Sequence, residues 1–137
     1  MKVEYRVAGA GGNYAVLFDA SAGDASSTYK ASFEDKAEIN PGFGAASQGV
    51  TPNANTLVTL EIPLTKVYAD QQTAKAAIRA YRAALRGLRL NLKVTVGNDV
   101  DFWPSAVLKA MTADLTGQAV DYSFTFNSQD VTNVEPP

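Results

Sequence analysis

Three acidic side chains at close spacing are the first candidates for chemistry in this sequence. Glu34, Asp35 and Glu38 could supply the paired carboxylates of general acid–base catalysis. That chemistry also needs rigid supporting elements and a pocket that shifts a pKa. Here the carboxylates lie with Lys36 at the edge of a long polar stretch. A solvated, charged segment is therefore the favoured interpretation.

Two further stretches match ligand-binding loops only in part. "NDVDFW" places Asp99 and Asp101 together, but a helix–loop–helix calcium loop starting at Asp99 would need Gly and Glu where Pro104 and Ala110 stand. "GAGGN" at 9–13 lacks the third glycine of a dinucleotide loop and precedes a strand pattern. We interpret both stretches as turns and expect no metal and no cofactor. Trp103, beside Phe102, is expected to pack in the core or an interface.

The composition removes the commonest catalytic groups. The chain has no Cys and no His, which excludes a thiol nucleophile, a disulfide, a Ser-His-Asp triad and an ordinary zinc site. Carboxylates and lysines alone can support catalysis, but no catalytic signature accompanies them. We therefore expect that the protein is not an enzyme.

Length and hydropathy predict a single domain over residues 1–137. No apolar run approaches the roughly 20 residues that span a bilayer. The first residues, "MKVEYRV", alternate polar and apolar, so they lack the apolar core of a signal peptide. We expect a soluble protein made in the cytoplasm.

The net charge of −2 conceals a segregation of charge. From Lys66 to Lys93 there are seven cations and one acid, which give +6, and the other residues carry five cations and thirteen acids, which give −8. The cations recur at helical spacing within "AKAAIRAYRAALRGLRL", residues 74–90. Such segregation suits attraction between copies of one protein, and it also suits a basic patch for nucleic acid.

That stretch predicts one helix from about residue 70 to 86, between an Asp70 N-cap and Gly87. At 100° per residue its large apolar side chains share one face, namely Ala74, Ile78, Tyr81, Leu85 and Leu88. A second stripe holds the cations Lys75, Arg79, Arg82 and Arg86. Alanines cover most of the remaining circumference, where a second surface could approach closely.

Period-two alternation predicts seven strands around this helix. They are centred on "VEYRV", "NYAVLFD", "TYKASF", "LVTLEIPL", "LRLNLKVTV", "SAVLKAMTA" and "AVDYSFTFN". The pattern favours a mainly β fold: a two-sheet antiparallel β-sandwich with one flanking α-helix. Residues 34–55 are rich in Gly, Pro, Asn and Ser, and they predict a long inter-strand loop.

The helix is expected to contact another copy of the chain. The predicted subunit interface comprises Lys75, Arg79, Ala80, Arg82, Ala84 and Arg86 on the helix, and Glu34, Asp35 and Glu38 in the loop. A membrane surface is disfavoured because alanine stands where bulky anchors would be needed. The alternative is a small binding module that uses the basic stripe for nucleic acid or an acidic protein partner. However, no aromatic residues interleave with the stripe, and the chain is acidic overall.

The order of elements resembles ring-forming tail proteins of long-tailed phages. The likeness runs through "NTLVTLEIPL", the Ala/Arg-rich helix, "LRLNLKVTVGNDVDFWPSAVL" and "GQAVDYSFTF", about 80 residues in all. It is a likeness of architecture without a diagnostic motif. Residues 1–33 match less well, which leaves tail tube, distal tail and head–tail joining protein all open.

The resemblance implies a structural virion protein located in the tail and made in the host cytoplasm. It implies homo-oligomers, typically hexameric rings that can stack, with other tail proteins as partners and no membrane. DNA would be present only as cargo in a lumen that is often acidic.

Overall fold

The computed structural model describes the backbone of residues 1–22, 28–40 and 49–137, and the side chains of 1–21, 28–35 and 56–137. In chain order the elements are β1 (Lys2–Val7), β2 (Ala15–Asp19), the 3₁₀ helix η1 (Ala20–Ala22), β3 (Lys30–Asn40), β4 (Gly49–Val67), α1 (Gln71–Leu85), β5 (Arg89–Val96), β6 (Asp99–Thr116) and β7 (Ala119–Ser128). Seven strands and one principal helix were expected, and both are present in the described part of the chain.

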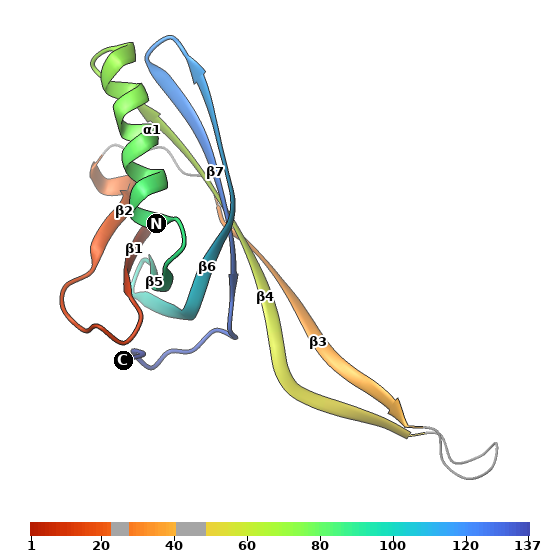
Figure 1. The fold of residues 1–137 in the computed structure, drawn as a ribbon. Helices are drawn as coiled ribbons and strands as arrows, with labels where there is room; N and C mark the ends of the chain where they lie inside the picture. The colour runs from red at the N-terminus through yellow and green to blue at the C-terminus, as the bar shows by residue number, and fades with distance from the viewer. Residues whose placement is uncertain (23–27, 41–48) are drawn as a thin grey trace.

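All seven strands belong to one antiparallel sheet, in the order β2-β1-β5-β6-β7-β4-β3. The two-sheet prediction is therefore corrected to a single sheet. The reason is β6, which pairs with β5 from Asp99 to Val107 and with β7 from Val107 to Thr116. This strand carries the hydrogen bonding from one half of the sheet to the other (Figure 1).

A local bend lets β6 serve both halves. Ser105 has a φ of 53°, a left-handed conformation that is rare for a residue with a side chain. Register irregularities flank it, between Leu90 and Leu92 of β5 and between Leu108 and Ala110 on β6. Irregularities of this kind bend a strand and increase its twist. The sequence pattern indicated a turn at "GND" and a separate strand from Ser105, and only the turn at 97–98 is present.

One apolar core lies between α1 and the sheet. The inward residues of β4 and β7 alternate as the sequence predicted, and their largest fully buried members include Leu60, Ile62, Phe124 and Phe126. Trp103 is also buried and has Tyr29 and Phe33 as ring neighbours, which confirms the packing role expected for it. Leu88, placed on the apolar face of the predicted helix, is exposed instead, because the helix ends at Leu85 and Leu88 stands in the connection to β5.

The segment predicted as a loop over residues 34–55 is largely a hairpin. Pairing between β3 and β4 continues past a register shift to Asn40 and Gly49. This hairpin extends well beyond the rest of the sheet (Figure 1). Turn-forming residues suggested a loop, but extended backbone also accommodates them in a hairpin that has no third strand beside it. The remainder of the predicted loop, residues 41–48, lies outside the described residues.

The helix begins and ends as its sequence predicts. The Asp70 carboxylate accepts a hydrogen bond from the Thr73 amide at 2.6 Å, as an N-cap does. Hydrogen bonds from the Thr73 amide and side chain lower the pKa of Asp70. Arg86 is the C-cap, and Gly87 follows with a φ of 72°, the left-handed residue that ends many helices.

Two tyrosine hydroxyls meet under α1. The Oη atoms of Tyr68 and Tyr122 are 2.8 Å apart. Burial, followed by the hydrogen bond with Tyr68, raises the pKa of Tyr122 above its ordinary value. The neutral phenol is therefore the form that fits the folded protein.

Alkaline pH should destabilise the fold through Tyr122. Because its folded pKa is raised, its contribution to stability is complete below the unfolded value near 10 and is lost as the pH rises further. Urea unfolding between about pH 8 and pH 11 should show a declining unfolding free energy. Tyr122→Phe should lose less over the same range. An equal loss in both proteins would contradict this assignment.

Ser105→Gly should leave the fold intact and stabilise it by up to about 1 kcal/mol, because glycine adopts positive φ without the steric cost of a side chain. Ser123→Gly, in the regular part of β7, is the matched control and should destabilise by about 0.5–1 kcal/mol. Thermal unfolding followed by circular dichroism compares the two. Destabilisation of equal size by both changes would show that Ser105 is not strained.

Candidate assembly surface

The inner face of α1 is fixed on the sheet by apolar packing and by Tyr81. Ala74 and Leu85 are fully buried. The Tyr81 ring stands edge-on to Tyr122 and Phe124, with centroids 5.1 and 5.7 Å away. Its hydroxyl donates to the Leu17 carbonyl at 3.0 Å. These contacts set which side of the helix turns outward.

The Lys66 ammonium also takes part in this arrangement. Its Nζ lies 2.9 Å from the Tyr81 hydroxyl, to which it donates, and 5.6 Å from the centre of the Tyr81 ring. The hydroxyl therefore receives one hydrogen bond and gives another. Lys66, which the sequence grouped with the basic region, therefore helps to hold the helix on the sheet through its contacts with Tyr81.

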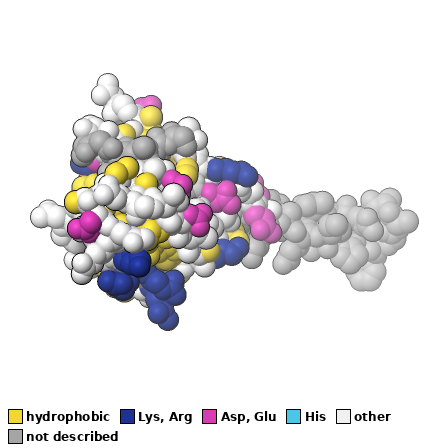
Figure 2. Space-filling view, turned by 90° about the horizontal axis from the view of Figure 1, so that it is seen from above, with side chains coloured by type: hydrophobic (Ala, Val, Ile, Leu, Met, Phe, Trp, Pro, Cys, Tyr) yellow, Lys and Arg dark blue, Asp and Glu magenta, His cyan; other side chains and the backbone are white. Residues whose placement is uncertain are grey.

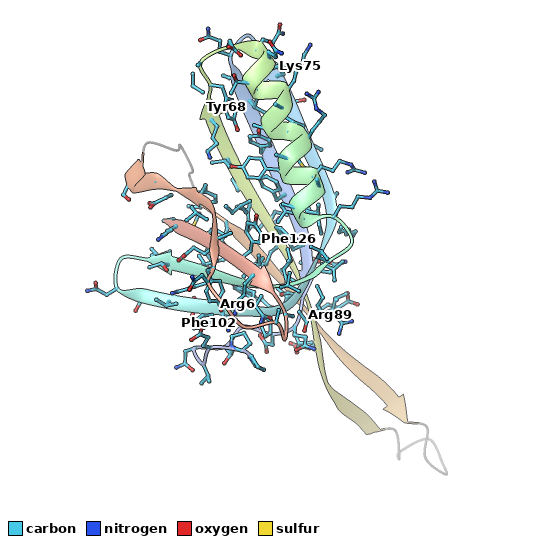
Figure 3. The ribbon with its side chains drawn as sticks, turned by 60° about the vertical axis from the view of Figure 1, so that its left-hand side comes forward. Arg6, Tyr68, Lys75, Arg89, Phe102 and Phe126 are labelled. Carbon is cyan, nitrogen blue, oxygen red and sulfur yellow. The ribbon has the colours of Figure 1, made fainter. Side chains whose placement is uncertain are left out.

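The outward side of α1, here called the α1 outer face, carries alternating cations and alanines. Its exposed members are Lys75, Ala76, Arg79, Ala80, Arg82, Ala83 and Arg86. Figure 3 shows Lys75 at the start of the helix, away from the strands. Within the described part of the chain, none of its four cations makes an ion pair or a side-chain hydrogen bond. The cations and the small apolar surface are thus both open to a partner.

The predicted interface residues do not all lie together. Ala84 is half-buried, whereas Ala80 and the four cations of α1 are exposed. Glu34 and Asp35 are exposed on β3, the last strand of the sheet, where Asp35 accepts a hydrogen bond from the Thr56 hydroxyl at 2.8 Å.

The remaining acid, Glu38, also belongs to β3, but its side chain lies outside the described residues. The main contacts of the helix with the sheet are with β6 and β7. The structure therefore separates the predicted acids from the cations within one subunit. Whether they meet across a subunit interface stays a prediction.

A second surface was missed in the sequence. The sheet face opposite α1 exposes Glu61 on β4, Asp114 on β6 and Asp121 on β7. Asp114 and Asp121 stand directly opposite each other in the β6–β7 register, an arrangement that costs stability through like-charge repulsion. Thr65 donates to the Asp121 carboxylate at 2.7 Å. We call these residues, with the Ser and Thr side chains around them, the open sheet face.

Charge is grouped only in part by side of the molecule. Figure 2 shows one group of Lys and Arg side chains at the lower edge of the view, while other cations lie beside Asp and Glu side chains. The outward positions of "AVDYSFTFN" indicated a polar face. The pairing of Asp114 with Asp121 depends on strand register, which alternation within one strand does not reveal.

The two ligand-like stretches are placed in ordinary backbone. Gly9, Gly11 and Gly12 have positive φ between β1 and β2, which confirms the turn at "GAGGN". The turn predicted at "NDVDFW" is limited to residues 97–98, because Asp99 and Asp101 are residues of β6, two positions apart on an extended strand. Among the residues whose side chains are described, no group of three or more acidic or sulfur- or imidazole-bearing side chains is arranged to hold a metal ion. No helix in the described ranges combines the length and apolar character needed to cross a membrane.

Ala80→Gln and Ala84→Gln should separate surface from core on the helix. Ala80 is exposed, so its change should alter subunit stability by less than about 0.5 kcal/mol. Ala84 is half-buried, so its change should cost about 1–3 kcal/mol by overpacking. Chemical denaturation at low protein concentration measures both. Equal costs would mean that the helix is rotated from the orientation described.

Comparison with known proteins gives a fold likeness and no family. No protein-family profile matches the chain, and no curated protein sequence matches it. A solved structure described as "Virion of native gene transfer agent (GTA) particle" contains a chain with a similar fold. The TM-score is 0.50 at 12% sequence identity, over 87% of this chain and 88% of that chain. The conclusion from these comparisons is that this mainly β chain shares its fold with a chain of that particle.

Proposed function

We propose that this protein is a structural subunit of a phage-like virion that assembles with copies of itself into a tail tube or tail ring. The supporting observation is the fold likeness to a chain of a gene transfer agent virion, which extends over nearly the whole length of both chains. The resemblance of the sequence to ring-forming tail proteins points the same way. In this proposal the chain has a structural role and no catalytic one.

The α1 outer face would be the principal contact between copies. Its alanines allow close approach, and buried apolar area contributes about 25 cal/mol per Å² before the costs of association. Exposed ion pairs contribute only about 0–1 kcal/mol each. The cations would therefore act mainly on orientation and register, with Glu34 and Asp35 of a neighbouring β3 as acidic partners.

Contacts between different patches of identical subunits generate rings when the rotation between copies closes. The α1 outer face and β3 lie on different elements, so a contact between them would be of this head-to-tail kind. Within the described chain, β2 and β3 are the edge strands of the sheet, and each pairs with one neighbouring strand. Six copies per ring, and stacking of rings, follow from the resemblance and belong to the proposal.

The open sheet face would line any channel for DNA. Asp114 and Asp121 repel phosphates, and the hydroxyls around them carry no charge, so DNA could pass without being held there. Lys30 stands opposite Glu61 in the β3–β4 register, so this carboxylate contributes less to the repulsion. The α1 outer face, on the other side of the sheet, would keep its cations away from the DNA. In this proposal, Asp114 stands opposite Asp121 at a cost in stability because the two carboxylates keep DNA from binding to the channel wall.

Reversing the basic stripe should prevent assembly. Arg79→Glu, Arg82→Glu and Arg86→Glu together should leave a folded subunit, because all three side chains are exposed, but should abolish rings and tubes. Ala80→Gln should impair assembly more than Arg82→Gln alone, because it keeps two surfaces apart. Light scattering and negative-stain electron microscopy measure the outcome.

Lys109→Glu is the matched control, since it reverses an exposed cation that belongs to β6 and not to α1. It should assemble like the unaltered protein. Rings formed normally by the triple variant would refute the role given to the stripe. A protein that stays monomeric at every concentration would refute the proposed function itself.

The rival proposal is a small binding module for nucleic acid or an acidic protein. It is favoured by the four α1 cations that have no partner within the described residues. A DNA mobility shift that weakens with salt and disappears in the triple variant would support it. We favour self-assembly because the fold likeness to a virion chain has no counterpart for the rival.

A further inference from the structure

Residues 129–137, here called the strap, follow β7 and return across the β1–β5–β6 half of the sheet. The first anchor is at β6. The Gln129 amide donates to the Pro104 carbonyl at 3.0 Å, and Phe102 and Thr132 exchange two backbone hydrogen bonds of 2.8 and 2.9 Å. The strap thus adds a short bridge to the part of β6 that β7 does not reach.

The second anchor is at β1 and β5. Arg6 donates from Nη2 to the Pro136 carbonyl at 2.7 Å and lies 3.3 Å from the Glu135 carboxylate. The Gly9 amide and the Asn91 side-chain amide both donate to the Pro137 carbonyl, at 2.9 and 3.0 Å. The strap is therefore tied at both ends by polar contacts.

Apolar burial contributes little to this attachment. Val134 is 70% exposed and Val131 is 36% exposed. A segment held by hydrogen bonds and one ion pair can detach without uncovering a large apolar area. Its attachment depends on how well the receiving groups are positioned.

Arg6 is positioned independently of the strap. Its Nη1 donates to the Gly12 carbonyl at 3.0 Å, and its guanidinium lies 4.5 Å from the centre of the Tyr14 ring. Lys93 lies 5.4 Å from the same ring. The arginine side chain is thus held at the sheet surface with Nη2 directed at the strap, near Phe102 (Figure 3).

Asn91 connects the strap to the bend of β6. It is 1% exposed, and its Oδ1 accepts a hydrogen bond from the Ser105 amide at 3.2 Å. Its Nδ2 is the atom that donates to Pro137. Ser105 is the residue in the left-handed conformation. One buried side chain therefore satisfies the bent backbone on one side and the strap on the other.

We propose that the strap is a brace that fixes the angle between the two halves of the sheet, and that its release frees the bend at Ser105. Every β6 residue that the strap contacts directly or through Asn91 lies between Phe102 and Ser105, where the strand passes from one half to the other. The inference concerns a single subunit and holds whether or not the chain forms rings.

Asn91→Asp tests the brace selectively. The new carboxylate keeps an acceptor for the Ser105 amide, but it has no N–H to donate to Pro137. The chain has no native Cys, so spin labels at Asn98→Cys and Thr116→Cys report the distance between the two ends of β6. The unaltered brace should give one narrow distance distribution. Asn91→Asp and Arg6→Met should broaden and shift it.

Amide hydrogen exchange shows separately whether the strap has detached. In both variants the Thr132 and Gly9 amides should exchange at least about tenfold faster. Arg89→Met, which alters an exposed arginine of β5, is the matched control and should change neither measurement. If Asn91→Asp disturbs folding, a chain that ends after Thr132 removes the second anchor while leaving the Arg6 and Asn91 side chains unaltered.

Two results would overturn the proposal. An unchanged distance distribution in a variant whose Thr132 amide has lost protection would show that the bend does not depend on the strap. Full protection of Thr132 and Gly9 in Asn91→Asp and Arg6→Met would show that these side chains do not hold it.

Discussion

The shared use of β6 is the constraint on which the rest of the structure depends. This strand of 18 residues pairs with β5 along its first part and with β7 along its second, and it bends between the two parts. The bend falls at Ser105, and Asn91 supplies the hydrogen bond that its backbone needs there. The backbone N–H and C=O groups of a sheet are satisfied by hydrogen bonds between paired strands. Because β6 pairs with both β5 and β7, it joins the two halves into one sheet.

That constraint also places the surfaces. Since the sheet bends around one core, α1 can cover only one of its faces, and the polar outward residues of β4, β6 and β7 remain on the other. The helix in turn has one face that the sheet buries and one that it leaves uncovered. This layering separates two charged groups: the four cations of the α1 outer face lie on the helix, and the opposed Asp114 and Asp121 lie on the far face of the sheet.

The sequence could predict what depends on local pattern. The helix boundaries followed from Asp70 and Gly87, and the inward residues of β4 and β7 followed from alternation, because these signals act within a few residues. The single sheet could not be predicted, since only the pairing partners of β6 distinguish it from two sheets. The hairpin over much of 34–55 was missed because glycine and proline carry the same signal in a loop as in an edge strand.

Only part of the candidate assembly surface could be predicted from the sequence. Helical spacing was sufficient to group Lys75, Arg79, Arg82 and Arg86, and the structure exposes all four. It did not separate Ala80 from Ala84, because the exact rotation of the helix is set by Tyr81 and its contacts with Leu17, Tyr122 and Phe124. The facing of Asp114 and Asp121 required register, and the path of residues 129–137 required the tertiary contacts of Arg6 and Asn91.

The strand order has a consequence for how the chain is made. β1 pairs with β5 through partners such as Val3 and Val94, and β4 pairs with β7 across α1, β5 and β6. A ribosome adds roughly 5–20 residues per second, so β5 is synthesised several seconds after β1, its partner in the sheet. The β5–β6 and β6–β7 pairs, by contrast, can form as local hairpins. Closing such long intervals is entropically slow. The sheet reaches its final order only once β7 has been synthesised, so the complete set of sheet surfaces forms only after that point.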